Sequence, residues 1–181
     1  MCFFFVVIFF FQAEDGIRYL VRSRGLGDVY KRQVQIQCVF APEHGFRGEQ
    51  GAGEKVKNGV DTKSGIQVIS LYGKHLKPTQ EDLEGIDLVM FDIQDVGARF
   101  YTYISTLQYV MEACAEQNKM LLILDRPNPN GFYVDGPVLD TNFRSFIGMN
   151  PIPVVHGMTI GEYAKMPVSY THLTLPTSDL V

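Results

Sequence analysis

The sequence predicts a layered α/β fold with a mainly parallel sheet. Two nearly continuous apolar runs, at residues 86–93 and 120–124, have the pattern of strands that are covered on both faces. Between them lies a segment with apolar residues at helical spacing, so strand, helix and strand follow one another within about 40 residues. This succession is the βαβ unit from which parallel sheets are built.

The other elements are assigned in chain order from the same patterns. Residues 35–40 and 67–72 are short β-rich runs, and the second is closed by Gly73. Residues 79–84 have the pattern of a short capped helix that ends at Gly85. The helix expected over 104–118 places Ile104, Leu107, Val110, Met111 and Cys114 on one face.

Length and charge exclude several classes of protein. The chain has 181 residues, which is enough for one ordinary domain. Its net charge of −4 argues against a nucleic-acid partner, because such proteins carry clustered basic residues. The three cysteines form no CxxC pair, so neither a zinc site nor a disulfide framework is indicated.

The two ends differ from the middle. The apolar run at residues 2–11 is shorter than the roughly 20 residues of a membrane-spanning helix, so no transmembrane span is expected. Residues 9–33 and 167–177 resemble translated sequencing-adapter read-through. We therefore expect 1–33 and 167–181 to be non-native segments. We also expect Pro167 to stop the helix that begins with the capping box Thr159–Glu162.

Polar residues gather after three of the expected strands, where ligands bind in parallel sheets. The candidates after residues 35–40 are Glu43 and His44. Those in and after 86–93 are Asp92, Gln94, Asp95, Arg99, Tyr101 and Tyr103. Those after 120–124 are Asp125, Arg126 and Asn128. We expect these side chains, together with His156 and Glu54, to line a polar pocket.

Each candidate also has a structural interpretation. Glu43 and His44 could cap the next segment, and Asp92 and Asp95 could form ion pairs with Arg99 and Arg126. The tyrosines fit either packing or stacking against a sugar. Asp125 fits a structural role, and His156 fits either the pocket or the cap of the last helix.

Several functional motifs are missing from the sequence. It contains no GxGxxG after a strand, no P-loop and no GxSxG elbow, which leaves nucleotide binding and that class of serine hydrolase without support. A metal site built from His44, Asp92, Asp95 and Asp125 is conceivable, but the spacing is not diagnostic.

Five motifs in order carry a family resemblance: FAPEHGFRGEQGAGEKV at 40–56, SLYG at 70–73, FDIQDVGARFYTYISTL at 91–107, LDRPNPNG at 124–131 and HGMTIGE at 156–162. In these five motifs, the chain resembles the NamZ/YbbC-type exo-β-N-acetylmuramidases. The resemblance implies a Rossmann-like catalytic domain, of which 34–166 would be a part, and a smaller C-terminal α/β domain that we expect to be absent from this chain. The family's first strand should precede residue 34, so we expect a sheet with an unpaired edge and marginal stability.

The resemblance further implies release of N-acetylmuramic acid from the non-reducing ends of peptidoglycan fragments, without a cofactor and outside the cytoplasm or on envelope fragments. Such hydrolysis needs an acid and a second group. Our candidate for the acid is Glu43, oriented by His44. Asp92, Asp95 and Glu54 are candidates for the partner, unless the substrate's own acetamido group serves.

Arg99 and Arg126 are candidates to bind the lactyl carboxylate of the muramyl sugar. Two other functions stay open at this point. One is a domain that binds muramyl sugars without cutting them. The other is a metal-dependent hydrolase built on Asp92, Asp95 and His44.

Overall fold

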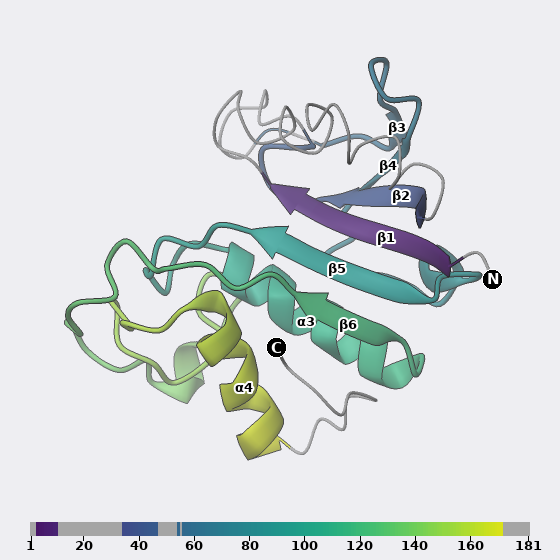
Figure 1. Cartoon of the computed structure of the whole chain (residues 1–181). Coiled ribbons are helices and arrows are strands. Elements are labelled where there is room, and N and C mark those ends of the chain that lie inside the picture. The colour runs from purple at the N-terminus through teal and green to yellow at the C-terminus, as the bar shows by residue number, and fades with distance from the viewer. Residues whose placement is uncertain (1–2, 11–33, 47–53, 55, 172–181) are drawn as a thin grey trace.

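The computed structural model describes residues 3–10, 34–46, 54 and 56–171 of the chain. The described strands form one six-stranded sheet in the order β3-β4-β2-β1-β5-β6 (Figure 1). Their bounds are Phe3–Phe10 (β1), Val34–Ala41 (β2), Gly59–Val60 (β3), Gln67–Ser70 (β4), Leu88–Ile93 (β5) and Met120–Ile123 (β6). All neighbouring pairs are parallel except β3 with β4. The predicted α/β class with a mainly parallel sheet is therefore confirmed.

The helices agree with prediction in part. The helix α3 spans Tyr103–Glu116, close to the expected 104–118, and α4 spans Ile160–Thr171. The segment at 79–84, expected to be a short capped helix, contains the short 3-10 helix η1 (Glu81–Leu83). A second 3-10 turn, η2, spans Thr141–Phe143. No described helix has the length and apolarity needed to cross a membrane.

Two expectations about the ends are wrong. The Phe-rich run forms β1 and lies between β2 and β5, so the sheet does not lack a strand there. Its aromatic and β-branched composition favours that conformation. Pro167 lies inside α4 instead of ending it. A proline inside a helix removes one backbone hydrogen bond and can kink the helix without ending it. The non-native origin of residues 1–33 and 167–181 stays a prediction, and most of both segments lies outside the described residues.

The sheet separates two apolar clusters. The larger cluster contains Phe40, Phe91, Leu107 and Tyr163, and both α3 and α4 contribute to it from the same side of the sheet (Figure 1). The smaller cluster, on the other face, is formed around Val39, Ala41, Phe46 and Val68.

A register shift in β2 explains which side chains join the smaller cluster. Phe5 is aligned with Ile36 and Val6 with Cys38, so Gln37 is passed over. An extra residue of this kind reverses the side-chain alternation, and Ile36 consequently packs with Val39 in the smaller cluster rather than with Phe40.

Candidate functional site

The site is built around Glu43, two residues beyond the carboxyl end of β2. The Tyr72 hydroxyl, from the segment after β4, donates to Glu43 Oε1 at 3.1 Å. The Thr102 hydroxyl, at the N-cap of α3, donates to Glu43 Oε2 at 3.1 Å. Three segments that are distant in the sequence thus converge on one half-buried carboxyl group, at the sheet edge where parallel folds bind ligands.

The chain reaches this position through a strained turn. His44 has φ of 71° and Gly45 has φ of 75°, and the Gly45 N–H donates to the Pro42 carbonyl at 3.0 Å. The left-handed conformation is uncommon for a residue other than glycine, and such strain is concentrated at functional sites. This hydrogen bond closes a β-turn that has Glu43 and His44 at its centre, and both side chains are half-buried.

Tyr72 is suited to remain a hydrogen-bond donor. Burial, together with the hydrogen bond to Glu43 and its charge, raises the pKa of Tyr72 above its ordinary value of 10.0. The phenol therefore keeps its proton at neutral pH and fixes the orientation of the carboxyl group.

Asp95 and His156 form a second, buried pair. Both residues are 4% exposed, and His156 Nε2 lies 3.4 Å from Asp95 Oδ2. The Met158 N–H donates to His156 Nδ1 at 3.3 Å, while Nε2 faces Asp95 without a hydrogen-bond partner among the residues that the structure describes. Asp95 Oδ2 also accepts from the Gly97 N–H at 2.7 Å, while Oδ1 has no hydrogen-bond partner among the described residues.

Asp92 lies on the other face of the sheet. Val89 and Phe91 belong to the larger cluster and Met90 packs against the smaller one, so the alternation of β5 places Asp92 on the face of Met90. Its Oδ1 accepts from Arg126 Nη2. Burial raises the pKa of Asp92, and the Arg126 charge opposes that rise. The ion pair considered for Asp92 is therefore present, with Arg126 as its partner.

The two tyrosines are placed differently. Tyr103 is 2% exposed within the larger cluster, and Tyr101 packs against that cluster with its ring edge-on to Tyr103 at 4.8 Å between centroids. Burial, and then Tyr101 and the charges of Glu43 and Asp95, raise the pKa of Tyr103. Tyr103 is thus positioned for packing rather than for stacking on a ligand.

Several other candidates anchor loops. Arg99 Nη1 donates to the carbonyls of Pro137 and Ile152 at 2.8 and 2.5 Å. Asn128 Nδ2 donates to the Met158 carbonyl at 2.8 Å, and Gln94 Nε2 to the Pro127 carbonyl at 3.2 Å.

The candidate Asp125 holds the start of α4. Its carboxylate accepts from the Thr159 hydroxyl and from the Gly161 N–H, both at 2.8 Å. Thr159 and Glu162 form the predicted capping box, with bonds of 2.8 and 3.1 Å. The remaining candidate, Glu54, is exposed.

The described side chains do not assemble a metal centre. No three His, Cys, Asp or Glu side chains gather within the described part of the chain. Asp92 bonds to Arg126, Asp95 faces His156 and Asp125 caps α4, so the structure does not bring this set together with His44.

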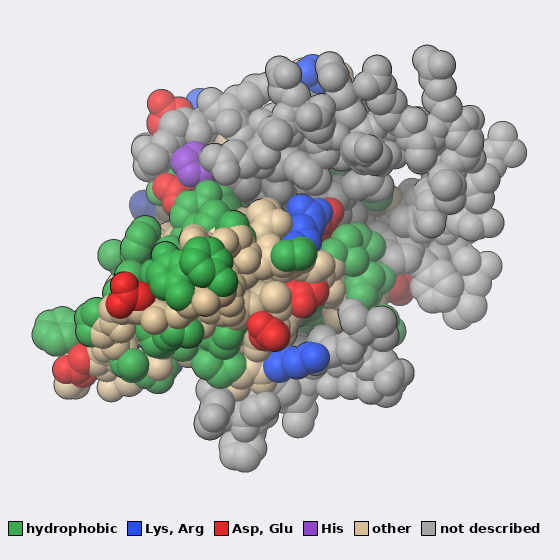
Figure 2. All heavy atoms as spheres, turned by 60° about the vertical axis from the view of Figure 1, so that its left-hand side comes forward, with side chains coloured by type: hydrophobic (Ala, Val, Ile, Leu, Met, Phe, Trp, Pro, Cys, Tyr) green, Lys and Arg blue, Asp and Glu red, His purple; other side chains and the backbone are tan. Residues whose placement is uncertain are grey.

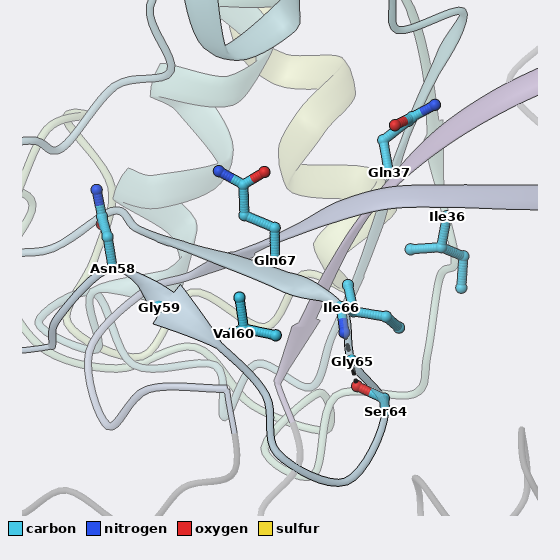
Figure 3. Close-up of a pocket in the computed structure, with 9 residues that line it drawn as sticks. All are labelled: Ile36, Gln37, Asn58, Gly59, Val60, Ser64, Gly65, Ile66 and Gln67. Atoms are coloured by element: carbon cyan, nitrogen blue, oxygen red, sulfur yellow. Dashed lines mark hydrogen bonds between the residues drawn. The ribbon is translucent and has the colours of Figure 1, made fainter.

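A hollow of about 680 Å³ lies at the other end of the sheet (Figure 3). Residues 36–37, 58–60 and 64–67 line it, next to the beginning of β4 and the passed-over Gln37. These residues carry amides, one hydroxyl and aliphatic groups but no acid or base. The hollow therefore offers no acid–base chemistry, and the candidate site stays with Glu43.

Sequence reasoning missed the two hydroxyls that hold Glu43. Tyr72 belongs to the SLYG motif, and Thr102 stands between the two tyrosines that were considered. Both residues lie in the sequence motifs that carry the family resemblance, which was the one indication of a role. The residues next to them in the chain do not indicate that both hydroxyls contact Glu43.

Comparison with known proteins gives concordant matches. Residues 22–179 match the family model described as exo-β-N-acetylmuramidase NamZ, N-terminal. The chain is 52% identical over 134 residues to the peptidoglycan β-N-acetylmuramidase NamZ of Bacillus subtilis strain 168, covering 74% of this chain and 32% of that protein.

Two crystal structures of DUF1343 family proteins from Bacteroides fragilis NCTC 9343 have the same fold. One has a TM-score of 0.76 and 36% identity, and covers 96% of this chain and 43% of the other. The second has a TM-score of 0.71 and 38% identity, and the match covers 97% of this chain and 43% of the other. The chain thus spans about a third of its curated relative and less than half of either solved structure.

Proposed function

Since this chain belongs to the family of NamZ N-terminal domains, we propose that it carries the catalytic acid of a glycosidase. The proposed reaction releases N-acetylmuramic acid from the non-reducing ends of peptidoglycan fragments. The observation that carries the proposal is the Glu43 carboxyl group, held on both oxygens by the hydroxyls of Tyr72 and Thr102 at the ligand-binding edge of the sheet.

Glu43 donates a proton to the oxygen that leaves with the next sugar. General acid catalysis requires a carboxyl group whose position is fixed relative to that oxygen. The two hydroxyls provide this fixation, because a hydroxyl can donate to an ionised carboxylate and accept from a protonated one. The same contacts therefore persist on both sides of the proton transfer.

The second group is supplied by the substrate in this proposal. Asp92 and Asp95 are each 4% exposed and face Arg126 and His156, so neither presents a carboxylate to a sugar. The 2-acetamido group of N-acetylmuramic acid can attack its own anomeric carbon as the bond to the leaving oxygen breaks. Water then opens the resulting ring, with Glu43 accepting a proton from that water.

Arg126 is the proposed contact for the lactyl carboxylate. Its guanidinium bonds to Asp92 through Nη2, and the side chain is 27% exposed. A guanidinium has a planar set of five N–H donors that an ammonium group does not reproduce. We expect Arg126→Lys to weaken binding of muramyl substrates more than binding of N-acetylglucosaminyl analogues, and equal effects on both would place the contact elsewhere.

The test of the proposed function is the release of free N-acetylmuramic acid from the disaccharide N-acetylmuramic acid-β-1,4-N-acetylglucosamine. The assay is run with and without EDTA. Release that EDTA does not affect supports the proposal. Binding without release would favour a sugar-binding domain, and release abolished by EDTA would favour a metal-dependent hydrolase.

A further inference from the structure

The segment from Arg99 to Tyr103 contains one side chain that differs from its neighbours. Arg99 bonds to two carbonyls, Thr102 bonds to Glu43, and Tyr101 and Tyr103 pack in or against the larger cluster. Phe100 is instead 61% exposed. Sequence reasoning selected the two tyrosines as aromatic candidates, whereas the structure presents Phe100 to the solvent.

The backbone that carries Phe100 is held at several points. Tyr101 N–H donates to the Ala98 carbonyl at 2.9 Å, which closes a β-turn with Arg99 and Phe100 at its centre. The Arg99 N–H donates to the Val154 carbonyl at 2.7 Å, and Ala98 forms a bridge with Val155. Phe100 is therefore an exposed aromatic residue on a well-fixed turn.

This turn leads directly into the site. Thr102, two residues after Phe100, is bonded to the Glu43 carboxyl group. Figure 2 brings the carboxyl ends of the strands toward the viewer and shows hydrophobic side chains gathered there, with acidic side chains near them. An apolar surface thus lies on the same edge of the molecule as the proposed acid.

We propose that Phe100 is a sugar-stacking residue for the leaving sugar, the N-acetylglucosamine unit whose oxygen Glu43 protonates. This inference rests on the proposed function. The C–H groups on one face of a pyranose are apolar and partly positive, which complements the negative face of an aromatic ring. A terminal sugar that is cut by an exo-acting enzyme occupies the inner position, so the leaving sugar lies toward the solvent, to which Phe100 is exposed.

Other exposed aromatic residues provide matched controls. Phe132 and Phe143 are 82% and 74% exposed, more than Phe100. They follow β6 and lie on segments without a described bond to Glu43. All three phenylalanines are therefore exposed, but of the three only Phe100 lies two residues from Thr102, which bonds to Glu43.

The experiment measures both turnover and binding of N-acetylmuramic acid-β-1,4-N-acetylglucosamine. We expect Phe100→Ala to raise KM roughly tenfold with a smaller change in kcat, Phe100→Tyr to restore KM, and Phe143→Ala to leave it unchanged. Binding is measured separately in a Glu43→Gln background, where Phe100→Ala should raise the Kd by a similar factor. Unfolding curves check that each variant is folded.

The outcomes separate this inference from the proposed function. Equal KM and Kd values for Phe100→Ala and Phe143→Ala would overturn the role of Phe100 and leave the proposed function intact. Binding that depends on Phe100 in a chain that releases no sugar would overturn the proposed hydrolysis alone. If the Glu43→Gln chain does not bind the disaccharide, the comparison of KM between Phe100→Ala and Phe143→Ala decides the inference.

Discussion

The Thr102 hydroxyl lies 3.1 Å from Glu43 Oε2, although the two residues are 59 positions apart in the sequence. The contact joins the start of α3 to the segment after β2, across the edge of the sheet. Tyr72 completes the arrangement from a third segment. The proposed acid is therefore oriented by tertiary structure, and any change that moves α3 relative to β2 also moves the acid.

Removal of either hydroxyl should slow the reaction. We expect Tyr72→Phe and Thr102→Val each to lower kcat up to about tenfold, because one hydrogen bond to the carboxyl group contributes about 1 kcal/mol. Steady-state kinetics on the disaccharide provides the measurement.

Thr102→Ser is the matched control for this prediction, because it keeps the hydroxyl. It should retain most of the activity. If Thr102→Ser and Thr102→Val lost activity equally, the hydroxyl would not be the relevant group.

The Asp95–His156 pair should contribute to stability. His156→Ala removes a buried ring that faces Asp95 and whose Nδ1 accepts from the Met158 N–H, and leaving a buried polar group without its partner costs about 1–3 kcal/mol. We expect a loss of this order in the free energy of unfolding, measured by urea denaturation. The exposed Val138 provides a control, since Val138→Ala should change that free energy by less than about 0.5 kcal/mol.

Asp92 should give a distinct pH dependence of stability. Its folded pKa is raised above the ordinary value of 3.8, mainly by burial. The folded state therefore binds more protons than the unfolded state in the interval between 3.8 and the raised value. The contribution of Asp92 to the free energy of unfolding is therefore fully present below that pH interval, and it decreases as the pH rises through the interval.

The comparison that checks this uses Asp92→Asn, which cannot titrate. We expect unfolding free energies measured from about pH 3 to 7 to fall less steeply in the variant than in the original chain. Parallel curves for the two proteins would mean that Asp92 is not the responsible group.

Local patterns predicted the elements whose residues are neighbours in the chain. The apolar runs of β5 and β6, the helical spacing of α3 and the capping box of Thr159 and Glu162 all have a short-range signal. The short strand β3 was not predicted, because its two residues pair only through the hairpin with β4. The place of β1 at the centre of the sheet likewise depends on partners far along the chain.

The site was predicted in composition more than in geometry. Glu43 lies beyond the end of β2 as the sequence indicated, whereas Asp92 and Asp125 make separate contacts with Arg126 and with the start of α4. The partners of Asp92 and Asp95, and the hydroxyls on Glu43, depend on contacts between residues 29 to 61 positions apart. The spacing of residues along the chain does not predict such contacts. The structure was therefore needed to show which candidate side chains anchor loops and which are exposed.

The most direct test of the central claim is the kcat of Glu43→Gln on N-acetylmuramic acid-β-1,4-N-acetylglucosamine, with Glu81→Gln as an exposed glutamate control. The substituted amide keeps the size of the side chain but has no acidic proton to transfer. We expect Glu43→Gln to lower kcat by about 10²–10⁴-fold and Glu81→Gln to leave it unchanged. A Glu43→Gln chain that retained the full rate of release would contradict the account.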